Sequence, residues 1–232
     1  MSKVGIITGA SGGIGRALAI ELSKIDYQLL LLGRNESRLK LTADLCKTKG
    51  VKINCLAGDL LDSCHIDKVA KEINEKYKKV DVLINNAGIA IRNPIHQIST
   101  EDWKKVLDTN VSVAVYLTKI VLKKMIKKKE GAIINISSLS GRFCSADNAL
   151  YSASKHALNG LTGSVFEDVR EFGIKVSSIM PGFVATELTS KIGRDSEKMI
   201  NPSDVAETVK FILNTSKNCC PTEIVLRPQF QP

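Results

Sequence analysis

The feature that most constrains the fold is a regular alternation of short apolar runs with longer segments of helical periodicity. Each run is a few residues long and rich in Val, Ile and Leu, as expected of strands that are covered on both faces. The expected strands are Lys3–Thr8, Tyr27–Leu32, Val51–Ala57, Val80–Ile84, Ala132–Ile136, Ile174–Met180 and Glu223–Leu226. The pattern predicts a buried, mostly parallel sheet.

The segments between these runs place apolar residues three or four positions apart, as one face of an α-helix requires. The expected helices are Gly13–Lys24, Glu36–Lys49, Ser63–Lys78, Thr100–Lys128, Leu150–Phe172 and Pro202–Leu213. Repeated strand and helix define the α/β class, with a doubly wound, seven-stranded sheet and helices on both faces. No linker, repeat or low-complexity tract divides the chain, so we expect a single domain over residues 1–232.

A glycine-rich turn follows the first expected strand and contains Gly9, Gly13 and Gly15. Glycine suits such a turn because a Cβ would block the approach of a phosphate to backbone N–H groups. The following helix N-terminus also favours negative charge. The spacing differs from the usual G-x-G-x-x-G fingerprint. A tight turn without a ligand is the alternative that these glycines alone leave open.

Tyr151 and Lys155 are four residues apart on an expected helix, so both project from one face. A free Tyr has a pKa of about 10. A nearby ammonium lowers that pKa by favouring the phenolate, as general acid–base catalysis at neutral pH requires. Tyr-x-x-x-Lys occurs on many surface helices, so its context matters. Ser137-Ser138 lies just after an expected strand, and Ser138 precedes Tyr151 by thirteen residues, with Ser137 as the neighbouring candidate.

Together these motifs resemble the classical short-chain dehydrogenase/reductase family, whose loop is Thr-Gly-x-x-x-Gly-x-Gly. The resemblance spans about Val4 to Leu213. It implies a Rossmann-type fold and hydride transfer between a nicotinamide and a carbonyl or alcohol carbon. It also implies a catalytic set of Asn110, Ser138, Tyr151 and Lys155. In the family the Tyr is the general acid/base, the Ser binds the substrate oxygen and the Lys binds the ribose. The Asn lies in a kinked helix and holds a water that connects to the Lys.

The resemblance also implies a cofactor site along the carboxyl ends of the strands. In the family the Asp at position 59 binds adenine, the Asn-Asn-Ala-Gly loop packs on the cofactor, and the Pro-Gly turn meets the nicotinamide. The expected cofactor-binding residues are Gly9, Ser11, Gly13, Ile14, Gly15, Arg34, Asp59, Leu60, Asn86, Ala87, Gly88, Tyr151, Lys155, Pro181, Gly182, Val184 and Thr186.

Arg34 predicts that the cofactor is NADP(H). An acidic residue after the second strand binds the ribose hydroxyls of NAD, whereas a basic one accommodates the 2′-phosphate of NADP. Gly33 stands where the family's NAD-selecting Asp would be, and Arg34 follows it. An Arg fork matches a phosphate well, and Ser11 adds a hydroxyl. The alternative is an Arg34 that only begins the next polar loop.

The sequence leaves the substrate open. We expect Arg92, Ser140, Arg142, Phe143 and Asn148 to border the pocket, with Arg142 either meeting an anionic group or lying in solvent. Similarity to 3-oxoacyl-[acyl-carrier-protein] reductases makes an acyl thioester one candidate, and a general ketone or aldehyde fits as well. The short segment Glu187–Asn201 predicts an open or shallow pocket. A non-catalytic NADP(H)-binding regulatory protein on the same fold is the alternative from another class.

Composition limits the expected partners. The net charge of +9 favours anionic partners, but the run Lys123–Lys129 lies near a helix C-terminus, where cations are stabilised. The run lacks aromatic residues for stacking, so we expect no nucleic acid. The cysteines and histidines lack metal-ligand spacing, so we expect no metal and reduced thiols. No apolar stretch is long enough to span a membrane, and we expect a cytoplasmic protein.

We expect a homodimer or homotetramer that forms through the helices around residues 100–128 and 150–172. The segment 223–232 lacks the glycine-rich ending found in bacterial oxoacyl-carrier reductases of the family. In many members that ending helps to build a subunit interface. The dimer is therefore better supported by the sequence than the tetramer.

Overall fold

In the part of the chain that the computed structural model describes, residues 2–46, 50–190 and 193–232, seven parallel strands form one sheet. The strands are β1 (Lys3–Thr8), β2 (Tyr27–Gly33), β3 (Ile53–Ala57), β4 (Val82–Asn85), β5 (Gly131–Ile136), β6 (Ile174–Pro181) and β7 (Glu223–Leu226). The α-helices are α1 (Gly13–Ser23), α2 (Glu36–Leu45), α3 (Ser63–Lys76), α4 (Thr100–Leu107), α5 (Val113–Lys128), α6 (Ala149–Val169) and α7 (Pro202–Asn214).

The strand order is β3-β2-β1-β4-β5-β6-β7, so β1 lies between β2 and β4. The register places Ile6 beside Leu30 on one side and beside Leu83 on the other. The chain therefore runs outward in both directions from β1. Such a switch point opens a crevice at the carboxyl ends of the strands, where open α/β sheets bind ligands.

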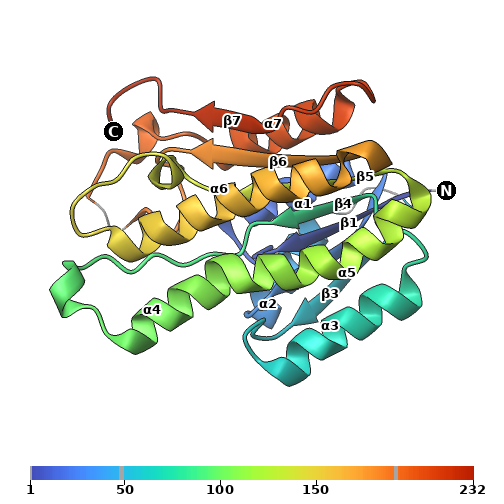
Figure 1. Ribbon diagram of the computed structural model, residues 1–232, viewed down its shortest axis with the longest axis horizontal. Coiled ribbons are helices and arrows are strands. Elements are labelled where there is room, and N and C mark those ends of the chain that lie inside the picture. The colour runs from blue at the N-terminus through green and yellow to red at the C-terminus, as the bar shows by residue number, and fades with distance from the viewer. Residues whose placement is uncertain (1, 47–49, 191–192) are drawn as a thin grey trace.

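Two apolar cores cover the two faces of the sheet. Neighbouring residues of a strand point to opposite faces, so Ile6 and Ile7 belong to different cores. Residues of α1, α2 and α7 pack on one face, and residues of α3, α5 and α6 pack on the other. In Figure 1, α5 and α6 cross in front of the sheet. This double cover confirms the expected doubly wound α/β fold.

Polar residues fix where several helices begin. The side chains of Asn35, Asp62 and Ser99 accept hydrogen bonds from backbone N–H groups in the first turns of α2, α3 and α4. Such caps satisfy donors that have no partner within the helix. Gly12 precedes α1 without a side-chain cap, which matters for the site described below.

The structure differs from the sequence expectations in a few places. The sheet is wholly parallel, and no residue of β3 or β7 is fully buried, because these strands lie at the sheet edges. The expected helix Thr100–Lys128 contains a π-helical segment, Asp108–Ser112, between α4 and α5. Helix α2 ends at Leu45, and the remainder of its expected range includes residues 47–49, which lie outside the described residues.

None of the described helices is long and apolar enough to cross a membrane. Within the described residues, no cluster of three or more His, Cys, Asp or Glu is suited to a metal ion, and the six cysteines are free thiols. Two lysines of the basic run have structural partners. Lys128 pairs with Asp81 and Glu130, and Lys124 donates to the carbonyl oxygen of Asn74. These contacts favour a structural role for that part of the run.

Candidate active site

The glycine loop between β1 and α1 forms one wall of a cavity of about 470 Å³. Gly9 and Gly13 have φ angles of 66° and 52°, in the left-handed region that favours glycine. A Cβ on Gly15 would collide with the carbonyl oxygen of Gly9. Gly9, Ser11, Gly13 and Ile14 line the cavity, whereas Gly15 supports the close packing of the loop beneath it.

Asn86 ties the loop after β4 to the glycine loop. Its side-chain amide donates to the carbonyl oxygens of Thr8 and Gly9, at 3.0 and 3.3 Å. The hydroxyl of Thr8 accepts from the backbone N–H groups of Asn86 and Ala87, each at 2.9 Å. Asn86, Ala87 and Gly88 all line the cavity, so these bonds align two of its walls.

Asn110 lies in the π-helical segment and is buried. Its Oδ1 accepts from the N–H of Ile89 at 2.8 Å, and its Nδ2 donates to the carbonyl oxygen of Ile89 at 2.9 Å. The same Nδ2 donates to Ser154 Oγ at 2.9 Å. The Asn110 side chain thus joins the loop after β4 to α6, just behind the cavity wall.

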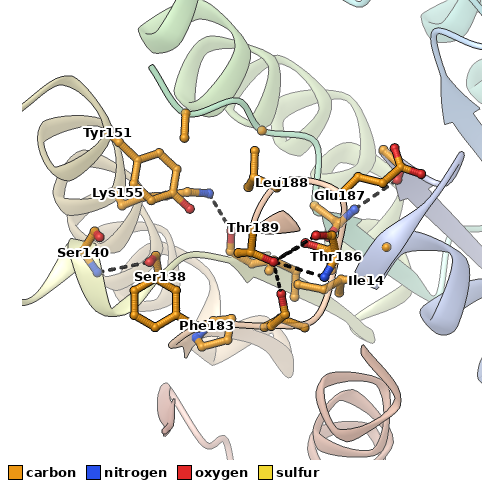
Figure 2. Close-up of a pocket in the computed structure, with 18 of the residues that line it drawn as sticks. Ile14, Ser138, Ser140, Tyr151, Lys155, Phe183, Thr186, Glu187, Leu188 and Thr189 are labelled. Atoms are coloured by element: carbon orange, nitrogen blue, oxygen red, sulfur yellow. Dashed lines mark hydrogen bonds between the residues drawn. The ribbon is translucent and has the colours of Figure 1, made fainter. Parts of the chain in front are cut away.

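Tyr151 and Lys155 project from α6 into the cavity, and Ser138 faces it from the end of β5 (Figure 2). The Nζ of Lys155 lies 5.6 Å from the centroid of the Tyr151 ring and donates to the carbonyl oxygen of Ile136 at 2.8 Å. The Oγ of Ser138 accepts from the N–H of Ser140 at 3.1 Å. Three of the four expected catalytic side chains therefore line one cavity, with Asn110 directly behind it.

The electrostatics of Tyr151 differ from the sequence expectation. Burial raises the pKa of the phenol, although a hydrogen bond with Ser138 and the positive charge of Arg92 act in the opposite direction. Burial also lowers the pKa of Lys155 to about 8. The expectation that the neighbouring ammonium gives Tyr151 a lowered pKa is wrong for this structure, because the effect of burial is larger.

The turn after β6 forms the opposite wall. Pro181, Gly182, Val184 and Thr186 line the cavity, and a Cβ on Gly13 would meet the Thr186 side chain at 3.1 Å. Thr189 Oγ1 donates to the carbonyl oxygen of Val184 at 2.5 Å, which holds the turn closed. In Figure 2, Leu188 lies between Tyr151 on one side and Thr186 on the other.

Some expected site residues lie elsewhere. Arg34, Asp59 and Leu60 are outside the set of residues that line the cavity, although they follow β2 and β3 as the sequence indicated. Arg38 lines the cavity instead, and its Nη2 would be 3.5 Å from a Cβ on Gly12. Arg34 precedes Asn35, the N-cap of α2, whereas Arg38 lies in the first turn of that helix, so helical spacing from Arg34 gave no signal for Arg38.

The expected border residues divide in a similar way. Arg92, Ser140 and Asn148 line the cavity, whereas Arg142 and Phe143 are exposed and do not. The position of Arg142 favours the solvated alternative. Sequence reasoning missed several lining residues, most of which lie outside the α-helices and strands: Gly12, Arg38, Ala90, Ile136, Leu139, Ser145, Phe183, Glu187, Leu188, Thr189 and Arg194. Ser137, the neighbour of Ser138, also lines the cavity.

Comparison with known proteins places this fold and site in one class. The family model described as short chain dehydrogenase matches residues 3–197. An uncharacterised oxidoreductase of Staphylococcus aureus is 30% identical over 226 residues, which are 97% of each chain. One of Staphylococcus saprophyticus is 31% identical over 227 residues, also 97% of each chain. The chain belongs to the short-chain dehydrogenase family and is an oxidoreductase of that family.

Solved structures agree with this assignment. A metagenomic short-chain oxidoreductase in complex with NADP is 30% identical, with a TM-score of 0.86 over 99% of this chain and 98% of that one. An alcohol dehydrogenase from the archaeon Thermococcus sibiricus, complexed with 5-hydroxy-NADP, is 26% identical, with a TM-score of 0.90 over the same shares. A variant of actinorhodin polyketide ketoreductase with NADPH is 28% identical, with a TM-score of 0.89 over 98% and 96% of the chains.

Proposed function

We propose that the enzyme is NADP(H)-dependent and transfers hydride between the nicotinamide and a carbonyl or alcohol carbon, with Tyr151 as general acid/base. The observation that carries the proposal is the single cavity that Tyr151, Lys155 and Ser138 share with the glycine loop. The NADP or NADPH bound in the similar structures supports the choice of cofactor. The shared cavity argues against a purely regulatory role on the same fold.

The residues present fit a dinucleotide. The cavity of about 470 Å³ is within the usual range for small-molecule sites. Helix α1 starts at Gly13 without a side-chain cap, so its first N–H groups are available to phosphate oxygens. Ser11 and Arg38 lie beside this loop and supply a hydroxyl and a guanidinium for the 2′-phosphate. When bound, the nicotinamide supplies or accepts the hydride.

The chain's own residues handle the proton. Ser138 holds the substrate oxygen by a hydrogen bond, and Tyr151 donates a proton to that oxygen during reduction. Because burial raises the pKa of Tyr151, the phenol is protonated at neutral pH and is ready to act as the proton donor. Lys155 binds the ribose from the same face of α6. Asn110 keeps the loop after β4 in register with α6.

We further propose that 3-oxoacyl compounds belong to the substrate class. The likeness to a polyketide ketoreductase supports this choice, because polyketide chains carry such groups. The test follows NADPH oxidation against 3-oxoacyl compounds, diketones and aldehydes, with NADH in parallel. Turnover by the wild-type enzyme with NADPH preferred is the expected result.

Tyr151→Phe provides the matched variant, because it removes only the phenolic hydroxyl. We expect it to lose about two to four orders of magnitude in kcat while it binds NADPH with unchanged affinity. Unchanged kcat would remove Tyr151 from the proposal. Tight NADPH binding by the wild type without turnover of any carbonyl would favour the regulatory alternative.

We also propose that two copies pair through the helices of residues 100–128 and 150–172. Gly160 and Gly163 lie on an open face of α6, where a Cβ on either would meet nothing within 4 Å. The half-exposed Trp103 adds apolar surface on α4, a helix that contacts α6. Light scattering of the wild type and of Gly163→Arg tests this pairing, and a monomeric wild type would contradict it.

A further inference from the structure

The charges that line the cavity are unbalanced. Among the residues that the structure describes, five charged side chains line it, of which four are positive and one is negative: Arg38, Arg92, Lys155, Arg194 and Glu187. Two of the positive groups have partners or roles already described. Arg38 forms an ion pair with Glu187, and Lys155 donates to the carbonyl oxygen of Ile136. The charges of Arg92 and Arg194 are therefore not balanced by any carboxylate in the cavity wall.

Arg92 lies close to the reacting group. Its positive charge acts on the phenol of Tyr151 and lowers that side chain's pKa, against the larger opposing effect of burial. In the described structure Arg92 takes part in no ion pair or hydrogen bond, so all its donors are available. A substrate whose carbonyl oxygen meets Tyr151 brings its neighbouring atoms into the field of this guanidinium.

Arg194 reaches the cavity from the segment after β6 and is held in place there. Its guanidinium lies 4.3 Å from the centroid of the Phe183 ring, a cation–π distance. Its Nη1 donates to a main-chain oxygen of Pro232, the last residue of the chain, at 2.9 Å, and Pro232 lies outside the cavity wall. Two contacts leave part of the five-donor fork unused, and stacking on an aromatic ring orients that fork.

We propose that the substrate carries a carboxylate group that Arg92 and Arg194 bind, so that the enzyme acts on free oxo acids and the corresponding hydroxy acids. Leu139, Phe183 and Leu188 supply apolar wall for the carbon chain, and Ser138 and Tyr151 meet the carbonyl oxygen. An Arg fork suits a carboxylate because both oxygens accept hydrogen bonds in one plane. This inference rests on the proposed function and specifies which carbonyl compounds it selects.

The experiment compares acids with their neutral esters. The probes are 2-oxo, 3-oxo and 4-oxo acids of short chain, each paired with its methyl ester, together with a neutral N-acetylcysteamine thioester and a phosphate monoester of a hydroxyketone. Two readouts are used: kcat/KM with NADPH, and calorimetric binding to the enzyme–NADP⁺ complex, in which no reduction takes place. The binding readout reports on recognition of the anion even where turnover fails.

Variants Arg92→Gln and Arg194→Gln are compared with Arg142→Gln, which removes an exposed arginine outside the cavity. For at least one acid we expect the wild type to favour the acid over its ester by about tenfold or more, and each cavity variant to reduce that ratio about tenfold. Using the ratio cancels the effect of Arg92 on Tyr151. Arg142→Gln is expected to keep the wild-type ratio.

Equal binding and turnover of acid and ester across the series would overturn the inference, as would an acid preference that both cavity variants retain. Preference for the phosphate ester or the neutral thioester over every acid would also overturn it. Failure of the proposed function would give another result: NADPH would fail to bind, or no carbonyl compound would be reduced. If the cofactor binds but no carbonyl compound is reduced, tight binding of an acid that both variants lose would support recognition of the carboxylate and overturn the assigned reaction.

Discussion

Arg38 and Glu187 form an ion pair across the cavity, which joins the first turns of α2 to the segment after β6. Arg38 also lies over Gly12, beside the loop that we assign to the cofactor phosphates. Glu187 is therefore paired with the same guanidinium, that of Arg38, that we assign to the 2′-phosphate. A bound NADP(H) has to compete with this carboxylate, whereas NAD(H), which lacks the phosphate, does not.

Glu187→Gln should tighten NADPH binding and leave NADH binding nearly unchanged. The two side chains are 39% and 70% exposed, so their attraction is weak, and we expect a gain of roughly two- to fivefold. Arg38→Gln should weaken NADPH binding about tenfold or more, because it removes a charged donor. Fluorescence titration with both cofactors measures these affinities, with the exposed Glu197→Gln as control. Equal changes for NADPH and NADH would contradict the assignment.

Asn110 should be sensitive to replacement by Asp, although the two side chains have the same shape. The carboxylate still accepts from the N–H of Ile89 but donates to neither the carbonyl oxygen of Ile89 nor Ser154 Oγ. We expect kcat to fall at least tenfold and unfolding to require about 1–3 kcal/mol less free energy.

Thr118→Val separates these two effects. It removes a buried partner of Asn85, at 3.4 Å, from a position that does not line the cavity. We expect it to lower stability, as measured by urea unfolding, with kcat retained. If Asn110→Asp kept full kcat, the bonds between the loop after β4 and α6 would have no part in catalysis.

Much of the fold could be predicted because the spacing of apolar residues along the sequence reflects which faces of the strands and helices are buried. Ile6 and Ile7 face different cores, and a run that is apolar at every position is what a doubly covered strand requires. The edge strands β3 and β7 depart from this rule, since apolar residues such as Ile53 and Val225 are not fully buried there. Local sequence does not reveal which strand lies at an edge.

The candidate site was partly predictable for a related reason. Tyr151 and Lys155 lie on one helix with fixed spacing, so local geometry places them together. Arg194 and Glu187 reach the cavity through the path of a loop, which no local pattern encodes. The effect of burial on Tyr151 was also missed, because it depends on everything packed around the ring.

Asp81 should stabilise the sheet at the amino-terminal ends of its strands. Burial alone would raise its pKa, but hydrogen bonds from Lys128, the Val4 N–H and Lys79 outweigh burial and lower the pKa. We expect Asp81→Asn to reduce the free energy of unfolding by about 1–3 kcal/mol at neutral pH. The stabilisation is present above the ordinary carboxyl pKa and is lost as pH falls through the lowered one. The free energies of unfolding of the wild type and Asp81→Asn, measured with urea, should therefore converge at acidic pH. A difference that stays constant with pH would contradict this account.

Lys155 should make the stability of the wild type rise with pH in a defined window. Burial lowers its pKa from 10.5 to about 8, so between these values the unfolded chain binds more protons than the folded one. The contribution of Lys155 to stability must then increase from pH about 8 to 10.5, by up to about 3 kcal/mol. Lys155→Met lacks the titrating group, so its free energy of unfolding, measured with urea at each pH, should lack that rise. The exposed Lys104→Met should retain it.

The absolute stability of Lys155→Met also reflects the lost hydrogen bond to the Ile136 carbonyl oxygen, a group that does not titrate. The slope with pH is therefore the decisive quantity, and parallel slopes in wild type and Lys155→Met would show that the ammonium is not buried in solution.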